Sequence, residues 1–142
     1  AELIIRAAET GRLVMTTLPS TDAVQAVERL VAFLPTSQRQ DALHTIATTL
    51  RGVVSQRLLP QADGRGVVLV SEVVTVNEGI RNAIRTDKVD QIPNLMRAAP
   101  GAQSLDVSLR TLVMRRIIDI EVAALYASDP DRLRKAAAEM RS

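Results

Sequence analysis

The stretch RAAETGRLVMTTLPSTDAVQAVERLV (residues 6–31) has the mix of glycine, hydroxyl and charged side chains that is typical of an active site. It contains no histidine, and none of its side chains ordinarily exchanges a proton near neutral pH. Arg12 can offer a fixed positive charge to a phosphate, but its guanidinium does not titrate. The stretch therefore leaves three possibilities open: an enzyme, the second half of one, or a relative that has lost its chemistry.

Few other side chains could carry catalysis. His44 is the only histidine, and no second ligand stands at metal-binding spacing from it, so we expect an ordinary, partly exposed side chain. Asp41 can pair with His44 or cap locally, which does not make a catalytic dyad. The sequence has no cysteine, which excludes thiol catalysis and thiolate metal sites and fits a reducing compartment. No metal site is predicted. An enzyme that acts on a small molecule also has little support, because no acid-base pair or nucleophile-base arrangement can be read from the sequence.

Two arginines, Arg81 and Arg85, stand four residues apart in a segment with helical periodicity. This spacing places them on one helix face, where they could together grip an acidic partner or a neighbouring subunit. The alternative is a solvated charged face. Glu72, in an apolar run that is typical of a strand, could form an interstrand or intersubunit pair, and a structural role is the simpler interpretation.

The composition is that of a globular domain. The chain has 142 residues, of which 46% are apolar and 24% charged, and this is enough apolar material for a core. The formal net charge of +2 is small and evenly spread, so nucleic-acid binding is not expected. No apolar run approaches the roughly 20 residues of a membrane span, and the opening AELIIRAAET does not resemble a signal peptide.

Periodicity and turn signals place the elements of the first half. They predict helices over residues 1–9 and 38–51, and a further helix that starts after residues 20–22 and ends at Pro35. Leu13–Thr17 is predicted to be a buried strand. The runs VVSQRLLP and GVVLVSEVVT are expected to form two strands around a turn at Asp63-Gly64. This half is therefore predicted to be α/β.

After Val76 the strand signal disappears. Asn77 is predicted to cap a short helix, Pro93 lies where a first helical turn tolerates it, and Asp119 and Asp129 each mark a helix start. We therefore predict two domains, residues 1–76 as an α/β unit and residues 77–142 as a helical unit without strands.

Several blocks of this sequence resemble one family. AAETGRLVMTTLPSTDA, LRGVVSQRLLPQADGRG, EVVTVNEGIRNAIRTDKVDQIP, SLDVSL and YASDPDRLR resemble, in order and spacing, blocks of the pilus-retraction (twitching-motility) ATPases of the type II/type IV secretion ATPase superfamily. The resemblance covers essentially the whole chain. It implies the second half of a RecA-like P-loop NTPase core, after the Walker B region, followed by an all-helical C-terminal subdomain. The four-cysteine metal module of other branches is absent, which favours the retraction branch.

The resemblance also implies what a full-length member would add. The Gly-rich phosphate loop and the acidic Mg²⁺-site segments of the family precede the block with which this sequence begins, and no G-x-x-x-x-G-K-[ST] occurs in it. ATP and Mg²⁺ are thus expected as cofactors of a full-length member, and no cofactor is expected to bind this chain alone. The chain contains no expected catalytic residue and should not hydrolyse ATP by itself.

The opening stretch resembles the histidine box of the family, which reads the terminal phosphate of the nucleotide. Glu9, Thr10, Gly11 and Thr17 match the box, whereas Arg12 and Pro19 stand at its two histidines. Ser20 and Thr21 replace its closing Thr-Asn pair. Pro cannot donate a hydrogen bond, so the box is expected to be degenerate. The alternative is that Arg12 or Thr21 substitutes for the histidines.

The segment GIRNAIRT resembles the Ala-Ile-Arg-Asn-Leu-Ile-Arg-Glu motif of the retraction motors. Ile80, Arg81, Asn82, Ile84 and Arg85 match it. This match favours a role for both arginines over the solvated face. Arg51 and Arg57 flank GVVSQ and could reach a nucleotide held by an adjacent subunit, a role that the resemblance to hexameric motors suggests.

Two functional interpretations follow from the resemblance. In the first, the chain is the C-terminal part of a hexameric, cytoplasmic motor ATPase that is peripheral to the inner membrane. Such a motor would couple ATP hydrolysis to pilus retraction or secretion through inner-membrane platform proteins. In the second, it is a non-catalytic, degenerate interaction or regulatory module of the same family. A phosphate loop encoded directly upstream would favour the first.

Overall fold

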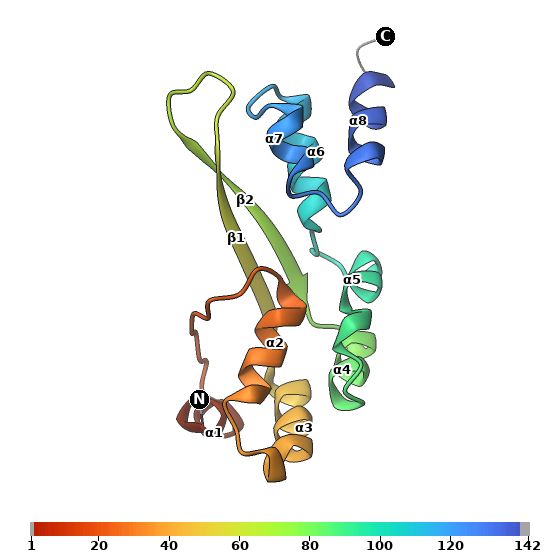
Figure 1. Ribbon diagram of the computed structural model, residues 1–142. Coiled ribbons are helices and arrows are strands. Elements are labelled where there is room, and N and C mark those ends of the chain that lie inside the picture. The colour runs from red at the N-terminus through yellow and green to blue at the C-terminus, as the bar shows by residue number, and fades with distance from the viewer. Residues whose placement is uncertain (1, 140–142) are drawn as a thin grey trace. The chain divides into compact units, whose positions relative to one another are not determined.

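The structure is a computed structural model that describes residues 2–139, so residue 1 of the first predicted helix lies outside it (Figure 1). The described residues combine helices with a two-stranded sheet, and the fold class is α/β as predicted. In chain order the elements are α1 (Glu2–Glu9), α2 (Ala23–Ala32), η1 (Thr36–Gln38), α3 (Arg39–Thr49), β1 (Gly52–Pro60), β2 (Val67–Thr75), α4 (Glu78–Arg85), η2 (Val89–Gln91), α5 (Ile92–Leu95), η3 (Met96–Ala98), α6 (Leu105–Met114), α7 (Ile120–Ala124) and α8 (Pro130–Glu139).

The elements pack into two compact units. The first unit holds the residues up to 55 together with 73–102, and the second holds 56–72 together with the residues from 103 on. Each strand of the β1–β2 hairpin therefore contributes to both units. The predicted boundary after Val76 concerns the domains of a full-length protein and stays a prediction.

The first unit has a core made by helices α2, α3 and α4 with the ends of the hairpin strands. Leu43 of α3 and Ile80 and Ile84 of α4 are fully buried in it. Burial of one such side chain stabilises the fold by about 1.5–3 kcal/mol. The periodic apolar positions that predicted these helices thus do form the packed face.

The second unit has its own core, in which the hairpin packs against α6, α7 and α8. Leu59 of β1, Val70 of β2 and Leu109 of α6 are almost completely buried there. Leu133, one of the periodic apolar residues of α8, packs in the same cluster. From Asn77 onward the described elements are all helical, apart from an isolated bridge at Gln103, as predicted.

Polar side chains begin the helices at the positions that the sequence indicated. The Asn77 side chain accepts a hydrogen bond from the backbone N–H of Ile80, and Asp119 accepts one from Glu121. Asp22 caps α2 in the same way by accepting from Gln25. Such a cap satisfies a backbone donor that the helix leaves open and contributes about 1 kcal/mol.

The hairpin has a register fixed at both ends. The N–H of Gln61 donates to the carbonyl of Gly66 at 2.9 Å, and the N–H of Val76 donates to the carbonyl of Arg51 at 3.0 Å. The predicted Asp63-Gly64 turn lies between the strands, and Gly64 has a φ of +70°, which glycine adopts without strain. Inward and outward side chains alternate along β1, as expected for a strand with one face buried.

The predicted strand over Leu13–Thr17 is wrong for this structure. Residues 12–20 form an extended segment that belongs to no sheet in the described part of the chain. Leu13 is 86% exposed and Met15 89% exposed. A strand needs a backbone neighbour to satisfy its N–H and C=O groups, and no described strand pairs with this one.

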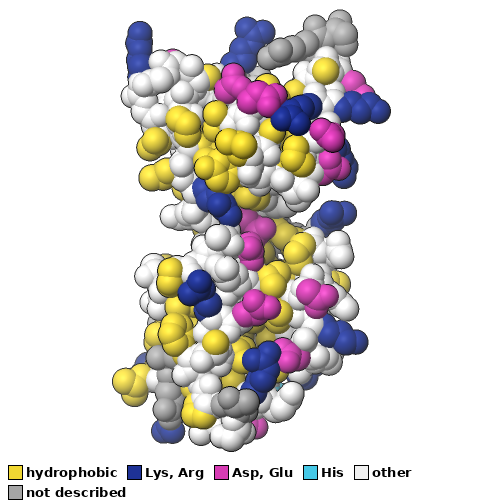
Figure 2. Space-filling model, viewed as in Figure 1, with side chains coloured by type: hydrophobic (Ala, Val, Ile, Leu, Met, Phe, Trp, Pro, Cys, Tyr) yellow, Lys and Arg dark blue, Asp and Glu magenta, His cyan; other side chains and the backbone are white. Residues whose placement is uncertain are grey.

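The surface mixes side-chain types. On the face shown in Figure 2, basic and acidic side chains are interspersed, and apolar side chains are visible among them. Within residues 2–139, the helices are too short or too polar for any of them to cross a bilayer.

Candidate functional site

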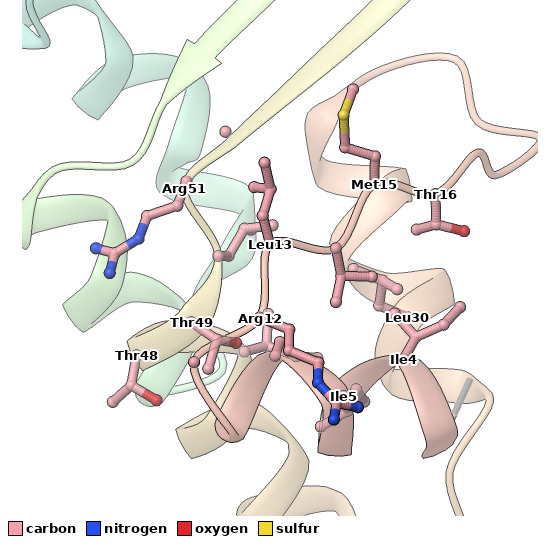
Figure 3. Close-up of a pocket in the computed structure, with 16 residues that line it drawn as sticks. Ile4, Ile5, Arg12, Leu13, Met15, Thr16, Leu30, Thr48, Thr49 and Arg51 are labelled. Atoms are coloured by element: carbon pink, nitrogen blue, oxygen red, sulfur yellow. The ribbon is translucent and has the colours of Figure 1, made fainter.

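A cavity of about 590 Å³ in the first unit contains part of the stretch that sequence reasoning singled out. It lies between α1, the extended segment after Gly11, the C-terminal end of α3 and the first residues of β1 (Figure 3). Its walls are mainly apolar. They are formed by Ile4, Ile5, Ala8, Gly11, Arg12, Leu13, Val14, Met15, Thr16, Leu30, Ile46, Thr48, Thr49, Leu50, Arg51 and Gly52.

The charged groups of the cavity are Arg12 and Arg51, two residues that sequence reasoning assigned to nucleotide sensing and to intersubunit contact. Figure 3 shows that their guanidinium groups point away from one another. Two cations that diverge cannot clamp one phosphate together. Each can still meet a separate negative group at the rim, so the arrangement suits a surface completed by another part of a protein.

The hydroxyl groups near this wall are already engaged in the helix. Thr49 Oγ1 donates to the Thr45 carbonyl at 2.7 Å, and Thr48 Oγ1 lies 2.9 Å from the same carbonyl. These bonds hold both side chains against α3. The oxygen atoms retain acceptor capacity, but these contacts direct the hydroxyl hydrogens of Thr48 and Thr49 to the helix backbone and not to the cavity.

The other residues of the box-like stretch are dispersed around the end of α1. Glu9 accepts a hydrogen bond from Thr45 Oγ1 at 2.9 Å, Thr10 donates to the Ala7 carbonyl, and Gly11 has a φ of +82°. Gly11 thus ends α1 in a conformation that most side chains avoid.

The C-terminal members of the same stretch lie apart from the cavity. Thr17 and Pro19 are exposed and are not among its lining residues. Thr21 Oγ1 donates to Asp22 at 2.8 Å, and the Thr21 N–H donates to Gln25 Oε1 at 2.9 Å. These contacts make Thr21 part of the start of α2, so of the two possible substitutes for the histidines only Arg12 lines the cavity.

Arg51 and Arg57, which were grouped in the sequence, fall into different units. Arg57 lies in the second unit with its guanidinium carbon 5.4 Å from the centre of the Tyr126 ring, a cation–π contact. Arg51 lies in the turn from α3 to β1. The structure therefore does not bring them together within one compact unit.

The motor-motif residues lie on α4 and divide between its two faces. Ile80 is fully buried, and Asn82 and Arg85 are exposed. The side chain of Arg81 is only 13% exposed and donates to the carbonyls of Ala47 at 2.6 Å and Thr48 at 3.0 Å. The shared face predicted from the i, i+4 spacing therefore holds two arginines in different surroundings.

Other residues considered from the sequence occupy ordinary positions. His44 and Asp41 are exposed on α3, and Glu72 is half-buried on β2. Among residues 2–139, no three His, Cys, Asp or Glu side chains come close enough together to hold a metal ion.

One contact that the sequence did not predict joins α3 to the second residue after α4. Arg39 and Asp87 form a bidentate ion pair in which the guanidinium of Arg39 donates to the carboxylate at 2.7 and 3.1 Å, and this hydrogen bonding raises the pKa of Arg39. The two residues lie 48 positions apart, so no local sequence pattern predicts this ion pair. A positive φ of 57° at Asp87 is likewise visible only in the structure.

Comparison with known proteins identifies relatives of this chain. It is 35% identical over 133 residues to a twitching motility protein of Neisseria gonorrhoeae and 34% identical over 131 residues to the type IV pilus retraction ATPase PilT of Pseudomonas aeruginosa. These alignments cover 92% and 91% of this chain. The chain spans only 36% and 38% of the two relatives.

Solved structures share the fold. A crystal structure of the pilus retraction motor PilT with bound ADP matches 94% of this chain with a TM-score of 0.81 and 36% identity, and the match covers 38% of that structure. The ATPase DotB of Legionella pneumophila matches 85% with a TM-score of 0.74 and 25% identity, over 33% of its own chain. The resemblance stated from the sequence is thus confirmed. The family model described as type II/IV secretion system protein matches residues 1–124, and the chain belongs to that family.

Proposed function

We propose that this chain is the C-terminal part of a hexameric motor ATPase that couples ATP hydrolysis to type IV pilus retraction or a related secretion process. The observation that carries the proposal is the match, over 94% of the chain, to a retraction motor whose structure contains ADP. The retraction names of the two curated relatives support it.

In this proposal the cavity of the first unit is part of the surface that faces the nucleotide. Arg12 would offer charge to a phosphate, and Arg51 or Arg57 would approach a nucleotide held by an adjacent subunit. Glu9, Thr10, Gly11, Thr17, Pro19 and Thr21 would form the remainder of a degenerate sensor box.

The magnesium ion that accompanies ATP would be held elsewhere. No carboxylate lines the cavity, and Mg²⁺ is normally bound through carboxylate and phosphate oxygens. The described residues do not fit this ion, so we derive no catalytic step through it. Hydrolysis would require a phosphate loop and metal carboxylates supplied by the rest of a full-length protein.

The exposed face of α4 is proposed to meet the machinery that the motor drives. Asn82 and Arg85 are exposed there, and the side chain of Arg85 makes no hydrogen bond or ion pair within residues 2–139. A guanidinium of this kind can bind a carboxylate of an inner-membrane platform protein or of a neighbouring subunit. In this role the full-length protein would be cytoplasmic and peripheral to the inner membrane, without a nucleic-acid partner.

A second function is a non-catalytic interaction module of the same family. The observation in its favour is that Arg12 and Arg51 diverge and that Thr21 is engaged at the start of α2. A full-length protein that carries these residues and still turns over ATP would exclude this alternative.

The experiment replaces Arg85 with Ala in the full-length protein and uses Lys88→Ala as the matched control. Both side chains are exposed cations near the end of α4. We expect Arg85→Ala to abolish retraction while ATP turnover stays within a few fold, and Lys88→Ala to retract normally. Equal loss of turnover and retraction would place Arg85 in hydrolysis, and normal retraction would contradict the proposed surface.

A further inference from the structure

The C-terminal end of α3 has backbone carbonyls in need of partners. Leu50 N–H donates to the Ile46 carbonyl at 2.9 Å, which closes the last helical bond. The carbonyls that follow it, beginning with that of Ala47, have no further turn of helix to bind them. Together they form the negative end of the helix dipole, where a cation is favoured.

Arg81 supplies that cation from α4. One guanidinium nitrogen, Nη1, donates to the carbonyl of Ala47 at 2.6 Å and to that of Thr48 at 3.0 Å. Its Nε also faces Glu78 at 3.3 Å, but Glu78 is 89% exposed, so water screens this ion pair. With only 13% of its own side chain exposed, Arg81 is held mainly by the end of α3.

The residues that follow this helix end are fixed from a second side. Arg51 accepts the backbone hydrogen bond from Val76, and Gly52 passes so close to β2 that a Cβ there would lie 3.0 Å from the Val74 carbonyl. The turn from α3 to β1 is therefore short and held at both ends. Thr48 and Thr49 at the end of α3, together with Arg51 on this turn, form one wall of the cavity.

We propose that Arg81 is a positioning residue for this cavity. By binding the open carbonyls of α3 it fixes the end of this helix and the turn over residues 50–51, and with it the direction in which Arg51 points. Its role thereby differs from that of Arg85, which the same motif contains but which faces solvent. The proposal that this wall serves nucleotide binding rests on the proposed function, whereas the control of the turn does not.

The first test measures amide hydrogen exchange on this chain without nucleotide. The reporters are the amide of Leu50, which closes the last bond of α3, and the amide of Val76, which donates to Arg51 on the turn. The amide of Ala99 serves as reference. A hydrogen bond to a charged group contributes about 1.5–3 kcal/mol, so Arg81→Ala should raise exchange at the two reporters about tenfold or more relative to Ala99. Arg81→Lys, which keeps a donor, should rescue part of this effect, and Arg85→Ala should show none.

A matched variant separates positioning from general stability. Val27 is buried in α2, and Val27→Ala lowers the stability of the same unit without removing a hydrogen-bond donor from the end of α3. It should raise exchange at all three amides alike. If Arg81→Ala, compared at an equal melting temperature, gave the same uniform increase, Arg81 would be an ordinary stabilising residue and the inference would be overturned.

The second test uses the full-length protein and ATP. We expect Arg81→Ala to raise KM for ATP several fold more than it lowers kcat, because the wall is misplaced while the reacting groups lie elsewhere. An unchanged KM together with faster exchange would show that the turn does not serve the nucleotide, which overturns that half of the inference. A wild-type protein without turnover would instead contradict the proposed function and leave the exchange result standing.

Discussion

Arg81 and Arg85 differ in role because only one of them is within reach of a helix end. Four residues on an α-helix advance the chain by about 6 Å and rotate it by about 40°, so the two side chains share a face. The C-terminal end of α3 meets α4 at the level of Arg81. One turn later, Arg85 lies beyond those carbonyls and remains exposed. Spacing predicts a common face, but it does not predict what lies opposite.

At the residue scale, Gly52 allows a direct test of the turn that carries Arg51. A Cβ at this position would lie 3.0 Å from the backbone carbonyl oxygen of Val74, which cannot move without distorting β2. We expect Gly52→Ala to lower the free energy of unfolding by about 1–3 kcal/mol, as overpacking does.

Gly66→Ala is the control for this prediction. The nearest atom to its added Cβ is a flexible Gln61 side-chain nitrogen at 4.0 Å, so the change should be nearly neutral. Urea unfolding of both variants measures the difference. Equal stability of the two variants would mean that β2 yields at Val74, and the turn would then be less constrained than its contacts indicate.

At the element scale, the success of a prediction depended on whether the partner of a segment is local. The hairpin was predictable because Asp63-Gly64 and the two flanking apolar runs are adjacent in the sequence. The helix starts at Asn77 and Asp119 were predictable because a cap acts over three residues. Leu13–Thr17 has the composition of a strand, but strand formation requires a distant neighbour that composition cannot supply.

The candidate site shows the same division. Arg12 was proposed from the resemblance to the histidine box and Arg51 from the resemblance to hexameric motors, and both line the cavity. The bond from Arg81 to the end of α3 joins residues more than 30 positions apart, and no sequence pattern encodes such a contact. The sequence therefore supplied these arginines as candidates. The structure was required to show that Arg12 and Arg51 line the cavity and that Arg81 binds the helix end beside it.

The ion pair between Glu121 of α7 and Arg134 of α8 predicts that the stability of the fold depends on pH. Arg134 donates to Glu121 at 2.7 Å, and this hydrogen bond lowers the pKa of Glu121 from its ordinary value of 4.5. A carboxylate with a lowered pKa stabilises the fold fully above 4.5, and this contribution is lost as the pH falls through the lowered value. The Glu121→Gln variant should therefore have a slightly lower melting temperature than wild type at neutral pH. In acid, the two proteins should have the same melting temperature.

Asp131→Asn is the comparison for this ion pair. Asp131 lies 3.3 Å from the same guanidinium and is 96% exposed, so its contribution should be smaller than that of Glu121 at every pH. Thermal melts of the three proteins as a function of pH measure both effects. A Glu121→Gln deficit that persists well below pH 4.5 would mean that lost packing, and not the charge, is responsible.

At the scale of the whole molecule, chain order and packing do not coincide. The hairpin strands belong to both units, so replacing a residue near the Asp63-Gly64 turn affects the second unit and replacing one near Gly52 affects the first. The cavity and α4 both lie in the first unit, and so does the hydrogen bond from Arg81 of α4 to the end of α3. A change in the cavity wall can thus reach α4 through contacts inside one compact unit, which is compatible with the coupling of nucleotide state to motion that we propose.

The last prediction concerns nucleotide binding by this chain alone. Phosphate binding by a P-loop protein depends on successive backbone N–H groups and a lysine, and the sequence contains no such loop. The cavity adds two arginines that point apart and no carboxylate for Mg²⁺. We therefore expect no ATP turnover above buffer and at most weak binding in calorimetric titration with ATP and Mg²⁺. Any weak binding should diminish in Arg12→Ala and Arg51→Ala. Micromolar affinity at one site per chain, unchanged in both variants, would place the nucleotide outside this cavity.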